Sequence, residues 1–338
     1  MITWSDGNGG IVSDDWKVLI KGPNDCVNYV IPKGVEHIAP KAFSGSGALS
    51  IDIPNTVKSI GTRAFEFCDN LYSLEIPESV EKIYGNPFVN YYYDLYVDSP
   101  HFVLEDDVLY TADKRKVVAC LYVHGTYVTP PEVEEIGEYA FAFQTQLKEV
   151  VLTENVRKIS DNAFYSCCTL EKVTMKSVTQ IGKFAFYGCF KLAMVEFGER
   201  LNMIDEYAFA MNMALEEVEL PRSLKRIGIG VFMCCMGLRS LKYHDLDVDR
   251  SHFICCFNLP SINGQEYSVR DYDDYSDNKV ISKILSHTKK ALDTEYKNSL
   301  IINALAWGDE EMENELEEEP KEKYPYEYGE GYIVDTDF

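Results

Sequence analysis

The stretch IGTRAFEFCDNLYSLEIP, residues 60–77, decides the fold, because most of its pattern returns along the chain. Its clearest element is the pair Ala64-Phe65, which recurs eight further times as Ala-Phe or a degenerate copy. Successive phenylalanines of this series lie 22, 23, 53, 23, 22, 23, 23 and 21 residues apart. A fixed period in the low twenties predicts a solenoid, in which each unit leaves an apolar face bare until the next unit stacks on it. The series consists of Phe43, Phe65, Phe88, Phe141, Phe164, Phe186, Phe209, Phe232 and Phe253.

Each repeat contains a predicted strand at a fixed distance from its phenylalanine. A leucine stands at the sixth position after the phenylalanine, and an aliphatic-x-aliphatic run such as Leu74-Glu75-Ile76 begins three residues later. Alternation with a period of two is typical of a half-buried strand. A second aliphatic pair, such as Val80 and Ile83, then leads into the next Ala-Phe.

These repeats resemble the BspA-like leucine-rich-repeat family, whose units read roughly V-x-x-I-x-x-x-A-F-x-x-C-x-x-L-x-x-V-x-I-P. The resemblance covers about residues 27–262. It implies an α/β repeat solenoid, a right-handed coil with a parallel sheet on its concave side. It names no ligand, because the family includes surface adhesins and many members without an assigned role.

The chain of 338 residues divides into four predicted parts. At the N-terminus, Trp16–Ile20 and Cys26–Pro32 are strand-like runs joined by a Gly-Pro-Asn-Asp turn, so a hairpin is expected to cover the open end of the core. After the repeats, apolar residues at three- and four-residue steps predict helix, and a like-charge block follows. The parts are a β-hairpin cap (1–30), the repeats (31–263), a helical C-terminal extension (264–308) and an acidic, tyrosine-rich tail (309–338).

The long step of 53 residues between Phe88 and Phe141 predicts an insertion at about residues 89–131. Alternating runs in this segment favour a β-hairpin island within the array. One interpretation is a spacer that rigidifies the middle of the array. The other is a binding lobe, because exposed aromatic residues are common binding anchors. The aromatic group concerned is Tyr91, Tyr92, Tyr93 and Tyr96.

Ten cysteines suggest metal or redox chemistry at first, but the fixed position that several of them occupy within the repeat favours a structural role. In eight of the nine repeats the third position after the phenylalanine is small or polar, which resembles the inward-facing ladder of leucine-rich repeats. A buried cysteine acts there as a small hydrophobe with a weak donor. The predicted ladder is Ser46, Cys68, Gln144, Cys167, Cys189, Asn212, Cys235 and Cys256.

No constellation of residues indicates catalysis, a cofactor or a metal. The six histidines are scattered, no cysteine pair has zinc-site spacing, and no glycine loop suits phosphate binding. The acidic run at 268–278 lacks the glycine and terminal glutamate of an EF-hand loop. The chain is therefore expected not to be an enzyme.

The formal net charge of −23 disfavours nucleic acid as a partner, because binding to phosphates needs a basic stripe. No apolar run is long enough to insert into a membrane, and the first ten residues lack the features of a signal peptide. These features predict a cytoplasmic protein. The alternative is a secreted or cell-surface protein whose signal sequence is missing from this sequence.

The outward residues of the predicted strands form a mostly acidic stripe, which we expect on the concave face. The leading functional prediction is a protein-interaction scaffold that attracts a partner with a basic surface. One alternative is an adhesin that binds host matrix or another cell, and another is an array that presents a C-terminal effector or regulatory module. The sequence does not indicate the oligomeric state. The stripe consists of Asp52, Glu75, Glu149, Val151, Thr174, Glu196, Glu217, Glu219 and Lys242.

Overall fold

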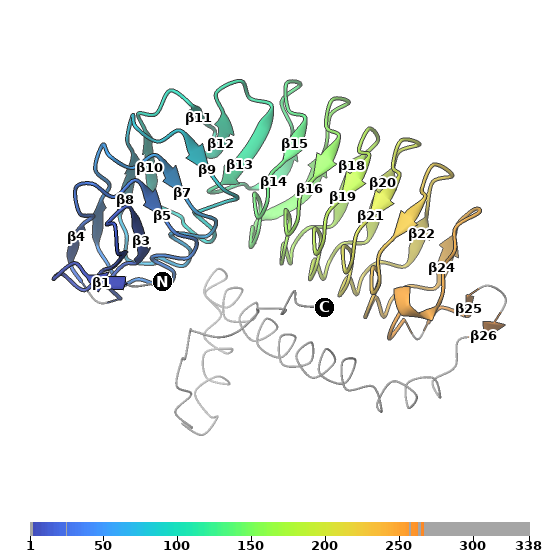
Figure 1. The fold of residues 1–338 in the computed structure, drawn as a ribbon. Coiled ribbons are helices and arrows are strands. Elements are labelled where there is room, and N and C mark those ends of the chain that lie inside the picture. The colour runs from blue at the N-terminus through green and yellow to red at the C-terminus, as the bar shows by residue number, and fades with distance from the viewer. Residues whose placement is uncertain (1–2, 25, 257, 263–264, 267–338) are drawn as a thin grey trace, which may run out of the picture. The chain divides into compact units, whose positions relative to one another are not determined.

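The computed structural model describes residues 3–24, 26–256, 258–262 and 265–266. These residues form a β-solenoid of stacked coils (Figure 1). They all belong to the first of the two units into which the chain divides, Met1–Tyr267. Apart from residues 265–266, which form a strand and not a helix, the predicted helical extension (264–308) lies outside the described residues, as does the acidic tail.

Each coil contributes one longer strand, which pairs in parallel with the equivalent strand of a neighbouring coil. Burial alternates along these strands, as in Ser73–Ile76, where Leu74 and Ile76 are buried and the other two residues are exposed. The alternation confirms the half-buried strands expected from the repeat pattern. The long strands are β4 (Asn28–Val30), β6 (Ser50–Asp52), β8 (Ser73–Ile76), β10 (Asp94–Val97), β14 (Gly125–Val128), β16 (Leu147–Val151), β18 (Lys172–Met175), β20 (Met194–Phe197), β22 (Glu217–Glu219) and β24 (Ser240–Lys242).

A second set of two-residue strands runs along another side of the solenoid. Each ends at a repeat aliphatic residue and pairs in parallel with its equivalent one coil away. These strands are β5 (His37–Ile38), β7 (Ser59–Ile60), β9 (Lys82–Ile83), β15 (Glu135–Ile136), β17 (Lys158–Ile159), β19 (Gln180–Ile181), β21 (Met203–Ile204) and β23 (Arg226–Ile227).

Two antiparallel meanders begin the two ladders of short strands. The first consists of β1 (Thr3–Ser5), β2 (Ile11–Ser13) and β3 (Val18–Lys21), and β3 then pairs in parallel with β5. The second consists of β11 (Phe102–Glu105), β12 (Val108–Thr111) and β13 (Lys116–Cys120), and β13 pairs in parallel with β15. Each meander therefore supplies the first strand on which later coils stack.

The predicted pairing of the N-terminal hairpin is wrong. The run at 16–20 pairs with β2 and β5, whereas the run at 26–32 contains β4, which pairs in parallel with β6. The described residues between the two runs, 22–24, lie between the short-strand side of the first coil and its long-strand side. A Pro-Asn turn signal marks a change of direction in either case, so the local sequence could not distinguish the two pairings.

The antiparallel island is narrower than residues 89–131. Tyr96 lies on β10, which is in parallel register with β8, and Tyr127 lies on β14, which is in parallel register with β16. Leu95 occupies the strand position of Leu74 but follows its repeat phenylalanine by seven residues rather than nine. This shortened spacing hid β10 from the repeat pattern.

The predicted α/β class is also corrected for the described residues. The helix among them is limited to one 3-10 turn, Arg250–His252, and β25 (Ser261–Ile262) and β26 (Gln265–Glu266) form a short hairpin after it. The coils turn through tight loops with two left-handed residues instead of helices. In the coil of Phe164, Asn162 and Ser166 have positive φ angles of 56° and 55°.

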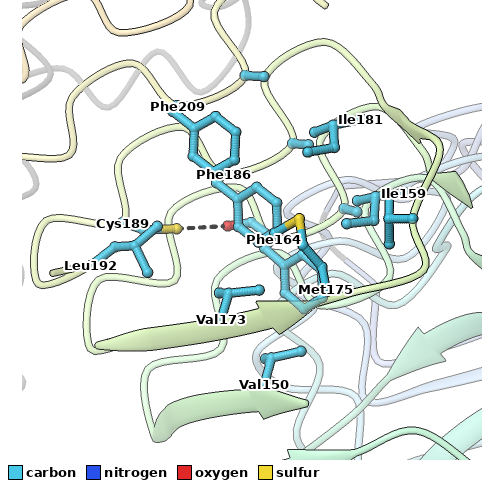
Figure 2. Close-up of a cluster of buried hydrophobic side chains, with 14 of the residues drawn as sticks. Val150, Ile159, Phe164, Val173, Met175, Ile181, Phe186, Cys189, Leu192 and Phe209 are labelled. Carbon is cyan, nitrogen blue, oxygen red and sulfur yellow. Dashed lines mark hydrogen bonds between the residues drawn. The ribbon is translucent and has the colours of Figure 1, made fainter. Parts of the chain in front are cut away.

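The repeat phenylalanines form a continuous column of stacked rings within each stack of coils. Phe164 lies 4.9 Å from Phe186 between ring centroids, and Phe186 lies 5.0 Å from Phe209 (Figure 2). All nine phenylalanines are buried, which confirms the predicted core. The column is interrupted between Phe88 and Phe141, where the second meander lies, so there are two main apolar clusters.

We call the coils with β4, β6, β8 and β10 the N-terminal stack, and those from β14 to β24 the C-terminal stack. Asn86 joins the two stacks on the Ala-Phe side. Its backbone N–H donates to the carbonyl of Glu138 at 2.8 Å, and its Nδ2 donates to the carbonyl of Tyr139 at 3.1 Å. The two stacks are thus hydrogen-bonded directly despite the 53-residue step.

Candidate interaction face and the inner ladder

The eight predicted ladder residues are all buried, and each side chain donates a hydrogen bond to the preceding layer. In six of them the acceptor is the carbonyl of the preceding repeat phenylalanine. The bond from Cys189 Sγ to the Phe164 carbonyl is 3.2 Å long (Figure 2). The other five are Cys68 to Phe43 (3.1 Å), Cys167 to Phe141 (3.0 Å), Asn212 to Phe186 (3.1 Å), Cys235 to Phe209 (3.1 Å) and Cys256 to Phe232 (2.9 Å).

The two exceptions lie where a meander precedes the coil. Ser46 donates to the carbonyl of Pro23 at 2.9 Å, and Gln144 donates to that of Cys120 at 3.0 Å. In both cases the preceding layer contains no repeat phenylalanine, so another backbone carbonyl takes its place. The longer glutamine side chain reaches the layer formed by the end of β13.

The ladder thiols are poor nucleophiles. Burial raises the pKa of Cys68 to about 12 and that of Cys235 to about 12, and it also raises the pKa of Cys189. A protonated thiol keeps the S–H that the ladder bond needs, whereas nucleophilic attack and metal binding need the thiolate. The ladder therefore uses cysteine as a buried donor.

The outward side chains of the long strands form a second, solvent-facing surface, which we call the long-strand face. The nine predicted stripe residues all lie on it and none is buried. Their positions are Asp52 on β6, Glu75 on β8, Glu149 and Val151 on β16, Thr174 on β18, Glu196 on β20, Glu217 and Glu219 on β22, and Lys242 on β24. That this face is the concave side of a right-handed coil stays a prediction.

In the C-terminal stack, lysines partly neutralise the stripe. Lys172 Nζ lies 3.3 Å from Glu149 and 3.4 Å from Glu196, one strand away on either side. Hydrogen bonds to these two carboxylates raise the pKa of Lys172. Lys242 pairs with Glu219 at 3.6 Å. The expectation of a mostly acidic stripe thus needs correction here, because cross-strand pairs balance much of the charge.

In the N-terminal stack, the carboxylates on the same face have no such partners. Among the described residues, no lysine or arginine forms an ion pair with Asp52, Glu75 or Asp98. Instead, a hydrogen bond shared with Asp98 and repulsion from it raise the pKa of Glu75, and Asp52 adds to the repulsion. Asp98 was missed in the sequence, because β10 has the shortened spacing described above.

The tyrosines predicted to belong to an island lobe are divided by the fold. Tyr91 is buried against Phe88, with ring centroids 5.9 Å apart, whereas Tyr92, Tyr93 and Tyr96 are exposed. Tyr96 stands on the long-strand face opposite Glu75. Tyr72, just before β8, is also exposed and was not singled out in the sequence. The exposed tyrosines therefore flank the array's own strands, outside the antiparallel meander.

A shallow hollow of about 300 Å³ lies beside the short strands, lined by Glu36, Lys58, Thr56 and neighbouring residues. Glu36 pairs with both Lys17 and Lys58, and their hydrogen bonds lower the pKa of Glu36 to about 2. The charges of this hollow are thus already matched to one another.

Across the described part of the chain, no three histidine, cysteine or carboxylate residues are grouped to hold a metal ion. Nor does a helix there have the length and apolarity to cross a membrane.

The chain matches the family model of the BspA type leucine rich repeat region in six copies, over residues 23–100 and 125–239. It belongs to this family. The gap between the matched segments contains the second meander, so the BspA type repeats stop and restart where parallel pairing does.

Solved bacterial proteins share this fold. A leucine rich cell surface protein from Faecalibacterium prausnitzii A2-165 is 25% identical, with a TM-score of 0.57, and the match covers 68% of this chain and 62% of that one. A leucine-rich repeat protein from Eubacterium ventriosum is 21% identical, with a TM-score of 0.61 and coverage of 70% and 72%. The chain thus spans less than two thirds of the Faecalibacterium protein. No curated protein sequence matches it.

Proposed function

We propose that this BspA type protein is a non-catalytic binding module whose long-strand face holds a partner protein with a basic surface. Proteins built from leucine-rich repeats generally mediate protein interactions, which supports binding as the role. The observation that carries the charge preference is the set of carboxylates on β6, β8 and after β10 that have no cationic partner. A net charge of −23 also attracts basic proteins and speeds their association.

We further propose that the protein acts at a cell surface. The support is the likeness to the Faecalibacterium protein, which is named a cell surface protein. The cytoplasmic location predicted from the first residues has no support from the comparisons. Surface labelling of intact cells that express the protein tests this proposal, and protection of the protein until the cells are lysed contradicts it.

The test of binding compares two triple variants with the same change in charge. Glu75, Glu196 and Glu219 are replaced by lysine on the long-strand face. The control replaces Glu81, Glu132 and Glu154, which are exposed elsewhere on the solenoid. Partners are captured from a lysate of the source cells and identified by mass spectrometry.

We expect the long-strand variant to lose the basic partners that the unmodified protein and the control variant retain. Equal retention by both variants contradicts a role for this face, because the two differ only in where the charges were reversed. Equal loss in both indicates attraction by net charge alone, and this result also contradicts the proposal.

A further inference from the structure

Exposed apolar side chains are concentrated in the N-terminal part of the solenoid. Fifteen large apolar side chains are exposed in the described part of the chain, and ten of them precede residue 100. Clustered exposed aromatic residues usually mark a binding surface. The ten are Trp4, Ile11, Trp16, Val27, Val30, Tyr72, Tyr84, Tyr92, Tyr93 and Tyr96.

Three of these tyrosines, Tyr72, Tyr93 and Tyr96, lie on or beside the paired strands β8 and β10. The rings of Tyr72 and Tyr93 meet edge to face, with centroids 6.3 Å apart. Tyr96 is the register partner of Glu75 in the parallel pair of strands. Tyr72 and Tyr96 are 65% and 56% exposed, so most of each ring is open to a partner.

Part of this surface is held rigid before any partner binds. The Tyr93 hydroxyl donates to the carbonyl of Asp69 at 2.7 Å. Behind it, buried Tyr91 packs on Tyr93 with centroids 5.9 Å apart and donates its hydroxyl to the carbonyl of Asp94 at 3.0 Å. A pre-ordered ring loses little entropy when a partner binds to it.

Carboxylates complete the surface. Asp98 follows β10, and its backbone N–H donates to the carbonyl of Ile76, the residue after Glu75, at 2.9 Å. Interaction with Asp98, and repulsion from Asp52 on the neighbouring strand, raise the pKa of Glu75. Adjacent strands lie about 4.8 Å apart, so a cation placed between these groups interacts with more than one of them. A cation there also relieves the repulsion that the carboxylates impose on one another.

We propose that this tyrosine–carboxylate patch, formed by Tyr72, Tyr93, Tyr96, Asp52, Glu75 and Asp98, binds arginine side chains of a basic segment in the partner protein. Arginine fits because its planar guanidinium stacks on tyrosine rings and bonds carboxylates in a bidentate manner, which lysine does not do. The proposal rests on the proposed function and locates its site in the N-terminal stack.

The test uses the full chain and fluorescent octa-arginine and octa-lysine peptides, with Kd measured by anisotropy at physiological salt. One pair of variants is Tyr96→Ala and its control Tyr84→Ala, a tyrosine exposed beside the short strands. The other pair is Glu75→Gln/Asp98→Asn and its control Glu132→Gln/Glu154→Gln, which removes two exposed carboxylates that lie outside the long strands.

We expect octa-arginine to bind more tightly than octa-lysine. Tyr96→Ala should weaken octa-arginine binding about two- to fivefold, which is typical of an exposed cation–π contact. The double carboxylate variant should weaken it about tenfold, since each lost pair is worth up to about fivefold. Tyr96→Phe and the two control variants should bind octa-arginine with a Kd within about twofold of that of the unmodified protein.

Equal weakening by each variant and its control overturns the proposal, because it indicates attraction by net charge alone. A second overturning result is binding of cellohexaose that depends on Tyr96 while octa-arginine binding does not, since this identifies the tyrosines as a carbohydrate platform. Failure of the patch inference can be distinguished from failure of the proposed function. If basic partners still depend on the long-strand face but not on Tyr96, Glu75 or Asp98, only the inference about the patch is lost.

Discussion

The long-strand face carries different side chains in the two stacks. In the C-terminal stack, Lys172 joins Glu149 and Glu196, so outward charges stabilise neighbouring coils. In the N-terminal stack, Glu75 faces other carboxylates and the strand beside it presents Tyr96. A surface optimised for stability pairs its charges, and the unpaired surface is the one where we propose that stability is given up for binding.

The inner column of rings tests whether the two stacks are also separate in stability. Phe186 is fully buried between Phe164 and Phe209, so Phe186→Ala should leave a large cavity and lower the free energy of unfolding by about 3–5 kcal/mol. Coils contact only their neighbours, so we expect hydrogen exchange to accelerate mainly in the C-terminal stack.

The matched variant is Phe65→Ala, which removes a ring between Phe43 and Phe88 in the N-terminal stack. It should accelerate exchange mainly in that stack. If either variant accelerates exchange equally in both stacks, the bonds from Asn86 and the second meander couple them into one cooperative unit.

The inner ladder gives the next largest effect. Cys189→Ala removes one of two donors to the Phe164 carbonyl, which keeps the backbone N–H of Cys167, and should cost about 0.5–1.5 kcal/mol. Cys189→Ser keeps a donor of similar size, as Ser46 does at the same position, and should recover most of the loss. Urea denaturation measures both. Equal destabilisation by alanine and serine indicates that sulfur packing, and not the hydrogen bond, determines the choice of cysteine.

The core was predictable because its signal is periodic. The nine phenylalanines and the ladder positions each recur with the repeat, and a fixed period predicts stacking without knowledge of the loops between. The tight turns were not predictable in the same way. Tyr139, Phe184 and Tyr207 have positive φ angles near 55°, where glycine or asparagine is the usual choice. Those rings gave no local sign of a left-handed backbone, and the resemblance implied only an α/β coil without specifying its turns.

The site was harder to predict than the core, because its residues belong to the one irregular repeat. Tyr96 and Asp98 follow Phe88 at a spacing two residues shorter than in other coils, so they were assigned to the island. Whether an outward carboxylate is paired depends on the strand one coil away. Glu75 and Glu219 occupy equivalent positions in the sequence, but only Glu219 has a lysine beside it. The sequence alone shows how many outward carboxylates there are, but not which of them have a lysine partner.

The smallest expected effect is also the sharpest contrast between the two faces. Asp98 raises the pKa of Glu75, so the charged form of Glu75 is disfavoured in the folded protein. Protonation of Glu75 therefore favours the folded protein. This contribution is complete at pH values below the ordinary pKa of about 4.5 that Glu75 has in the unfolded chain, and it is lost as the pH rises through the raised pKa of the folded protein. At neutral pH, Glu75→Gln removes the repulsion and should raise the free energy of unfolding, by no more than about 0.5 kcal/mol because the group is exposed.

Glu219→Gln, the equivalent change in the C-terminal stack, removes the partner of Lys242 and should lower the free energy of unfolding by a similarly small amount. Thermal melts across pH 4 to 7 measure both variants. The gain from Glu75→Gln should shrink as the pH falls and Glu75 in the unmodified protein becomes protonated. A loss of stability in Glu75→Gln at neutral pH contradicts the contrast, because it means that Glu75 stabilises its stack as Glu219 does. A gain in stability combined with weaker octa-arginine binding is the result expected of a carboxylate retained for a partner.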